Sequence, residues 1–122
     1  MSDRCMIGVA NSNNTITTVY CHWNGDPKDA GTILAENYQS AEKVGPLMRG
    51  GFLGVIAPTL EESRRMDPPE PAVTIADRQE FQLLGERMNA DFLYLFAEGE
   101  WLFATPYDEE WRKLTDVLAN WR

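Results

Sequence analysis

The sequence has few residues of the kinds that form reaction centres and structural cross-links. Its 122 residues include a single histidine, His22, and only two cysteines, Cys5 and Cys21. Two cysteines do not make a disulfide framework, so we expect both to be thiols in a reducing compartment. No metal or cofactor is expected, because there is no second histidine, no Cys-x-x-Cys pair and no glycine-rich phosphate loop.

Long apolar runs are absent and basic residues are scarce. No run approaches the roughly 20 apolar residues of a membrane span, and the first residues lack a signal-peptide core, so we expect a cytoplasmic protein without membrane contact. With 19 acidic against 11 basic residues, direct binding to nucleic acid is disfavoured. The charge fits a protein partner with a basic surface, such as a nucleic-acid-binding complex, although it also simply keeps a small protein soluble.

The composition is sufficient for one apolar core. Apolar residues make up 43% of the chain and include four tryptophans, at a length typical of one domain. We therefore expect a single domain over residues 1–122 with most tryptophans in its core. Trp121, near the C-terminus, is expected to be the most exposed of the four, at a contact with a partner or with a second copy in a homodimer.

The N-terminal segment predicts a β-hairpin. An apolar run at residues 6–10 and a β-branched and aromatic segment at residues 15–23 flank a turn cluster of asparagine and serine. A two-residue turn places Met6 opposite Cys21, whereas a three-residue loop places Cys5 there. Only the second register brings the two sulfur atoms together.

Neighbouring side chains of a regular strand point to opposite faces of the sheet. Cys21 therefore shares a face with Val19 and Trp23, and His22 shares the other face with Tyr20. A thiolate–imidazole pair needs both groups within hydrogen-bonding reach. Cys21 and His22 are consequently not expected to act together, and no catalytic residue is predicted.

Residues 24–51 predict two helices. Asp26 suits an N-cap and Pro27 the first helical position, and apolar residues recur at helical spacing as far as Tyr38. Ser40 suits the cap of a short second helix, which a Gly-Gly pair ends.

The middle of the chain is less regular. Residues 52–56 are either a strand or an apolar plug. Residues 59–71 combine three prolines with many charges and little apolar periodicity, which predicts a long exposed loop. Residues 73–76 suggest an edge strand, and residues 78–88 predict a helix with Phe81 facing inward.

The C-terminal third predicts a second hairpin and a last helix. Strands at 91–97 and 100–105 flank a Glu-Gly turn, and apolar residues on both faces are typical of strands in the middle of a sheet. Asp108 suits the N-cap of the last helix. The apolar stripe of that helix comprises Trp111, Leu114, Leu118 and Trp121. We expect an α+β fold: an antiparallel sheet of about four to five strands built from two β-hairpins, with three to four packed helices.

Several segments resemble a group of small bacteriophage and prophage proteins. In that group an opening hairpin leads into a Tyr-Cys-His-Trp-Asp-Gly-Tyr-Pro-type segment, and residues 20–27 here read Tyr-Cys-His-Trp-Asn-Gly-Asp-Pro. Glu-Asn-Tyr at 36–38 and Glu-Lys-Val at 42–44 match the helices that follow. Tyr-Leu-Phe at 94–96 and Gly-Glu-Trp at 99–101 match an aromatic strand, a turn and a tryptophan strand.

The similarity covers most of the chain except residues 59–71. The sequence departs from the group at Asn24, where aspartate is usual, and at Asp26, where tyrosine is usual. The resemblance implies a phage accessory protein of unassigned activity that binds host machinery, including immune systems, in the host cytoplasm. It does not imply an enzyme class.

Two groups of polar residues have simpler explanations than a site. His22, Cys21, Asp26 and Asp29 are all metal-ligand types, but Asp26 is expected to cap a helix and the imidazole to pack on a sheet face. The carboxylates between residues 98 and 110 are expected to be a solvated turn and a charged first helical turn.

The main hypothesis is a non-enzymatic, phage-derived protein that inhibits or redirects a host protein complex through its acidic surface, as a counter-defence inhibitor of the anti-CRISPR type does. The candidate partner-binding residues are Glu61, Glu62, Asp67, Glu98, Glu100, Asp108, Glu109 and Trp121. One alternative is a small enzyme or small-ligand-binding protein with a pocket near Tyr20, His22 and Asp26. Another is a homo-oligomeric structural or virion-accessory protein.

Overall fold

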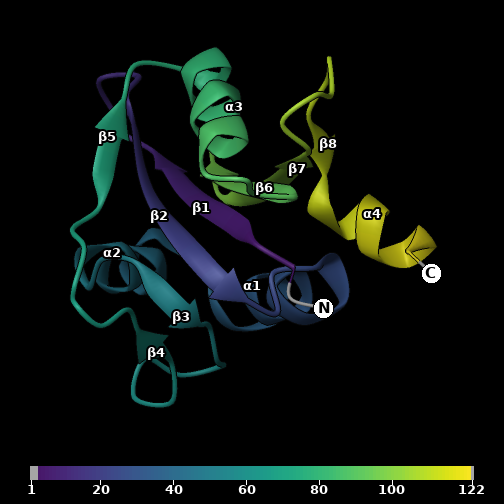
Figure 1. Ribbon diagram of the computed structural model, residues 1–122. Helices are drawn as coiled ribbons and strands as arrows, with labels where there is room; N and C mark the ends of the chain where they lie inside the picture. Colours follow the sequence, from purple (N-terminus) through teal and green to yellow (C-terminus); the bar gives the residue numbers. More distant parts are fainter. Residues whose placement is uncertain (1–2, 122) are drawn as a thin grey trace.

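The computed structural model describes residues 3–121 and consists of one β-sheet with helices on both faces (Figure 1). In chain order the elements are β1 (Cys5–Ala10), β2 (Ile16–Trp23), the π-helical turn η1 (Pro27–Gly31), α1 (Thr32–Asn37), α2 (Ala41–Arg49), β3 (Leu53–Val55), β4 (Arg64–Arg65), β5 (Val73–Ile75), α3 (Arg78–Arg87), β6 (Phe92–Ala97), β7 (Glu100–Ala104), β8 (Arg112–Lys113) and α4 (Leu114–Asn120).

The sheet is mixed, with the strand order β4-β3-β2-β1-β6-β7-β8, and β5 also pairs with β2. The α+β class is confirmed, but the expected antiparallel sheet of four to five strands is wrong, because the described residues form eight strands. Two strand pairs are parallel, β1 with β6 and β2 with β3. The segment between β2 and β3 contains η1, α1 and α2, and β3 then pairs in parallel with the last residues of β2.

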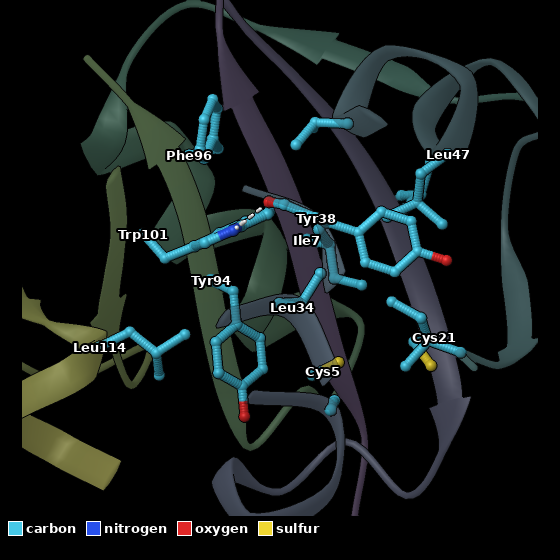
Figure 2. Packing of buried hydrophobic residues seen from close by; sticks show 14 of the residues in the cluster. Cys5, Ile7, Cys21, Leu34, Tyr38, Leu47, Tyr94, Phe96, Trp101 and Leu114 are labelled. Carbon is cyan, nitrogen blue, oxygen red and sulfur yellow. Dashed lines mark hydrogen bonds between the residues drawn. The ribbon is translucent and has the colours of Figure 1, made fainter. Parts of the chain in front are cut away.

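Apolar side chains pack on both faces of the sheet. On one face the core includes Ala30 from η1, Leu34 from α1, Leu47 from α2 and Leu114 from α4, all fully buried (Figure 2). The other face is covered by α3 (Figure 1), whose Phe81 is fully buried. Strands β1 and β6 are therefore covered on both sides, which for β6 agrees with the apolar residues on both faces of segment 91–97.

The first hairpin has the three-residue loop. The backbone N–H of Asn11 donates to Thr15 O at 2.8 Å, and that of Asn14 donates to Asn11 O at 3.0 Å. Asn14 adopts φ 70°, a left-handed conformation that asparagine tolerates better than most residues. The loop sets the register that places Cys5 directly opposite Cys21.

The first predicted helix is divided between η1 and α1, and its cap differs from the expectation. Asp26 is the N-cap residue and Pro27 follows it, but the Asp26 side chain accepts no backbone N–H. The wide first turn is closed by backbone groups instead, with Gly31 N donating to Asp26 O at 3.3 Å. Ser40 likewise stands at the N-cap of α2 without a side-chain cap bond, and Gly50 ends that helix as predicted.

Residues 52–76 are more ordered than predicted. Residues 53–55 form β3, and β4 lies inside the segment 59–71 that was expected to be loop throughout. Arg65 holds β4 in place, because its guanidinium donates to Leu47 O at 2.9 Å and to Gly51 O at 3.0 Å. The remainder of the segment is mostly exposed, and β5 forms the predicted edge strand.

The second hairpin is confirmed, and the last helix is present but begins later than predicted. Glu98 and Gly99 have φ values of 52° and 80°, as a two-residue turn between right-twisted strands requires. Residues 112–113 pair with β7 as β8, which delays α4 until Leu114. The Asp108 carboxylate accepts from Thr105 N at 2.9 Å in a turn and does not cap a helix.

The predicted apolar stripe is also divided, because β8 lies along the edge of the sheet. Trp111 stacks on Phe81 at 5.8 Å between ring centroids, on the α3 face. Leu114 is buried on the opposite face, where Trp121 packs edge-on against Phe92 at 5.7 Å. Strand pairing of residues 112–113 therefore overrides the helical spacing.

The expected order of tryptophan exposure is wrong. Trp23, at the end of β2, is 49% exposed, whereas Trp121 is half-buried. Trp121 is covered because it contacts Phe103 in addition to Phe92. Proximity to the chain end therefore does not determine exposure here, since α4 folds back onto the sheet.

Candidate functional site

Strand β2 separates the thiol and the imidazole of its central motif. Cys21 is buried in the core beneath α1 and α2, together with Val19 and Leu34. Tyr20 belongs to the cluster on the α3 face, and His22 bonds to it. The two chemically active neighbours therefore project from opposite faces of the sheet, as alternation along a strand dictates.

Tyr20 and His22 form a hydrogen-bonded pair. Tyr20 Oη lies 2.9 Å from His22 Nδ1, and the ring centroids are 5.8 Å apart. Burial raises the pKa of the Tyr20 phenol, and the nearby Arg4 charge partly lowers it again. Two further aromatic rings flank this pair. Phe52 packs on Tyr20, and Trp23 packs edge-on against His22 with 4.7 Å between the ring centroids.

Asp26, the third residue of the predicted pocket, belongs to a different group. Burial first, then a hydrogen bond and charge repulsion from Asp29, with a further contribution from Asp3, raise its pKa to about 6. Burial raises the pKa values of Cys5 and Tyr94, which lie in the core beneath the helices, and the Asp26 charge makes a smaller contribution in the same direction. The structure brings Tyr20 and His22 together and places Asp26 with other carboxyl groups at the start of η1.

Cys5 and Cys21 are a buried thiol pair. Both are free and 0% exposed, and their backbones are directly opposed in the hairpin. Burial, followed by the hydrogen bond to Cys21, raises the pKa of the Cys5 thiol well above its usual value. The same hydrogen bond lowers the pKa of the Cys21 thiol. A thiol without exposed surface does not meet a substrate in the folded state, so this pair contributes to the core (Figure 2).

The predicted partner-binding residues lie in separate regions. Glu61, Glu62 and Asp67 flank β4 at one edge of the sheet, whereas the others belong to β6, β7 and the segments that follow them. Glu98 and Glu100 are at the β6–β7 turn, and Asp108 and Glu109 follow the opposite end of β7. All are exposed except Asp108 and Trp121, which are half-buried. Acidic groups are thus distributed along the rim of the sheet.

One groove was not predicted from the sequence. It lies between the C-terminal end of α3 and the β7–β8 loop and has a volume of about 400 Å³. Its lining residues are Glu86, Asn89, Ala90, Asp91, Thr105, Pro106 and Tyr107. We call this the α3–Tyr107 groove. In the sequence, the only local signal for this groove is the Pro-Tyr-Asp segment after β7. In the structure, Tyr107 of this segment is 76% exposed.

Residues 3–121 contain no cluster of three or more histidine, cysteine, aspartate or glutamate side chains that could hold a metal ion. Within the same residues, no helix has the length and apolar character needed to cross a bilayer. No protein-family model matches the sequence, and no curated protein or solved structure matches it either.

Proposed function

We propose that this chain is a non-enzymatic, phage-derived binding protein that inhibits or redirects a host protein complex through its acidic surface. The observation that carries the proposal is the set of exposed carboxylates, which occupy separate regions along the rim of the sheet in a chain of net charge -8. A surface of this sign attracts a basic protein surface and repels nucleic acid. A counter-defence inhibitor that occupies the nucleic-acid groove of a host complex has this property.

The arrangement of the reactive groups favours binding over catalysis. The only histidine is bonded to Tyr20 on one face of the sheet, while Cys21 is buried on the other. A nucleophile and its base must lie within hydrogen-bonding reach of each other and of a substrate. The exposed carboxylates, by contrast, are accessible to a partner without rearrangement of the fold.

Affinity capture with the tagged chain from host-cell lysate, followed by reconstitution with the purified partner, tests the proposal. We expect a partner with a basic surface whose affinity falls steeply as salt rises from about 50 to about 500 mM, because screening weakens exposed charge pairs. Glu98→Gln with Glu100→Gln should weaken the purified complex. The matched control, Glu36→Gln with Glu42→Gln, removes the same charge from exposed positions on the helices.

The absence of a partner at low salt would contradict the proposal. So would an affinity that is independent of salt, or an equal loss in the two charge-matched variants. Equal loss would mean that only total charge matters, and then no particular surface of the chain recognises the partner.

The Tyr20–His22 hydrogen bond favours a second candidate, a small enzyme or small-ligand-binding protein that uses this pair. The phenol orients the imidazole, and an oriented imidazole can bind a polar ligand or transfer a proton. In that case His22→Ala abolishes the activity or the ligand binding while the domain stays folded. A change in the unfolding free energy alone would assign His22 a structural role.

A further inference from the structure

We propose that the α3–Tyr107 groove binds a single arginine side chain of the basic partner. This inference rests on the proposed function, because it names the group on that partner which the acidic surface recognises. The volume of about 400 Å³ falls within the range of about 300–1,000 Å³ that is typical of ligand pockets. One long side chain and its hydration water therefore fit.

The charges that line the groove select a cation. Glu86 and Asp91 contribute carboxylates from the last turn of α3 and from the segment that follows it. The backbone N–H of Arg4 donates to Asp91 Oδ2 at 3.2 Å, which fixes the position of that carboxylate. The lining thus repels anions and attracts a positive group.

Tyr107 supplies an aromatic face at the other wall. Its ring is 76% exposed, so a cation can approach it from solvent. A cation over an exposed aromatic ring gains about 0.5–1 kcal/mol. Arginine suits this site better than lysine, because its planar guanidinium stacks on a ring and bonds to a carboxylate at the same time.

Hydrogen bonds fix the loop that carries Tyr107 in the unbound protein. Gln82 of α3 donates from Nε2 to Thr105 O at 3.1 Å and to Asp108 O at 2.7 Å. The Asp108 carboxylate also accepts from Thr105 N at 2.9 Å. Both ends of the short turn are thereby bonded directly to α3, the helix that forms the opposite wall. A preorganised loop loses little conformational entropy on binding.

The occupant is a partner's side chain and not a second copy of this chain. Two copies of net charge -8 repel each other at long range, which disfavours self-association through an acidic groove. A basic protein offers arginine at high local concentration beside the other exposed carboxylates, so a weak single-residue contact adds to the affinity of the complex.

The test is an NMR titration of the ¹⁵N-labelled full chain with N-acetyl-arginine amide at low salt, with N-acetyl-citrulline amide as the neutral isostere. We expect saturable shifts confined to residues 86–91 and 105–107, with a dissociation constant on the order of 1 mM and no such shifts with the citrulline probe. Tyr107→Ala should weaken binding by about two- to fivefold, and Tyr107→Phe should retain it.

Two further variants separate the local charge from the total charge. Glu86→Gln should weaken arginine binding by about threefold, whereas Glu36→Gln, which removes an equal charge elsewhere, should leave it unchanged. Shifts distributed over all acidic segments, equal shifts with the citrulline probe, or unchanged affinity in Tyr107→Ala would overturn the inference. As a control, the ¹⁵N spectrum of each variant without ligand should match that of the folded wild type.

The outcomes also separate this inference from the proposed function. A purified partner complex that survives Tyr107→Ala unchanged would overturn the groove as the recognition site, while the binding function would stand. Saturable arginine binding in the groove, together with no captured partner at low salt, would support the groove and overturn the proposed function.

Discussion

The indole N–H of Trp101 donates to the backbone carbonyl oxygen of Tyr38 at 2.8 Å (Figure 2). The bond is buried and joins β7 to the residue that ends α1. It satisfies a carbonyl at a helix end, where the helix offers no backbone N–H. A single side chain therefore connects the second hairpin to the first helical segment, across 63 residues of sequence.

Trp101→Phe removes this donor and leaves the Tyr38 carbonyl buried without its partner. We expect a loss of about 1–3 kcal/mol in the free energy of unfolding, measured by urea denaturation, because an unsatisfied buried acceptor retains its desolvation cost. Trp23→Phe is the control, since Trp23 is half exposed, and it should change stability by less than about 0.5 kcal/mol. Equal effects of the two variants would contradict the assigned role of the bond.

Gly85→Ala should destabilise the protein although it improves helix propensity. Alanine gains about 1 kcal/mol over glycine in a helix. A Cβ at position 85, however, lies 2.7 Å from Leu93 Cδ2, and Leu93 is fully buried. Overpacking of this kind costs about 1–3 kcal/mol, so we expect a net loss of about 1 kcal/mol in urea denaturation.

A double variant tests the stated cause of that loss. Adding Leu93→Val to Gly85→Ala shortens the side chain that the new methyl group meets. The combined loss should be smaller than the sum of the single losses by at least about 0.5 kcal/mol. The difference between Gln79→Gly and Gln79→Ala, at an exposed position of α3, reports the effect of propensity alone. Additive losses would show that the contact with Leu93 is not the cause.

Asp26 should make the protein less stable as pH rises through weakly acidic values. Its folded-state pKa is about 6, above the ordinary value of 3.8. Between these two values the folded state binds more protons than the unfolded state, so the unfolding free energy falls as pH increases. The contribution of Asp26 to the free energy of unfolding is fully present below about pH 4. It is lost as the pH rises through about 6.

The variant Asp26→Asn keeps the size of the side chain and removes its titration. The decrease in the urea midpoint between pH 4 and pH 6.5 should be smaller in this variant than in the wild type. The difference between the two proteins isolates the effect of Asp26, because all other carboxyl groups are the same. Identical pH profiles would be incompatible with the raised pKa. A carboxyl ¹³C titration measures that pKa directly, and Asp29→Ala should lower it by removing the hydrogen bond and the nearby charge.

The thiol pair should be protected from reagents in the folded state. Cys5 and Cys21 are both 0% exposed, so a disulfide reagent such as 5,5′-dithiobis(2-nitrobenzoate) should react only through transient opening, and with both thiols in urea. Ser12→Cys, in the exposed hairpin loop, provides a control thiol that reacts at once. Rapid labelling of the native wild type would show that the hairpin opens far more readily than its packing indicates.

Local patterns in the sequence were enough to predict many elements. The Glu-Gly turn at 98–99 has the positive φ values that a two-residue hairpin needs, and α3 spans Arg78–Arg87, close to the predicted range 78–88. Both depend on residues a few positions apart. The separation of Cys21 from His22 was predictable for the same reason, because alternation is a property of any regular strand.

Several features that depend on distant segments were not predicted correctly. Asp108, Trp111 and Leu114 have helical spacing and a suitable cap, yet the segment pairs with β7 before the helix begins. The α3–Tyr107 groove escaped prediction because its walls come from α3 and from the β7–β8 loop, which only the packing of the sheet brings together. Spacing within one segment contains no information about its neighbours in space.

The sequence by itself determined the two hairpins, the α3 helix, the acidic charge and the division of the Cys-His motif between two faces, because turn chemistry, periodicity and composition act over a few residues. Tertiary structure alone decided that β1 pairs in parallel with β6, and that Trp121 is half-buried while Trp23 is exposed. It also decided that the pKa of the Asp26 carboxyl group is raised. Each of these outcomes depends on burial and on contacts between segments far apart in the chain, and such contacts form only when the whole sheet packs against its helices.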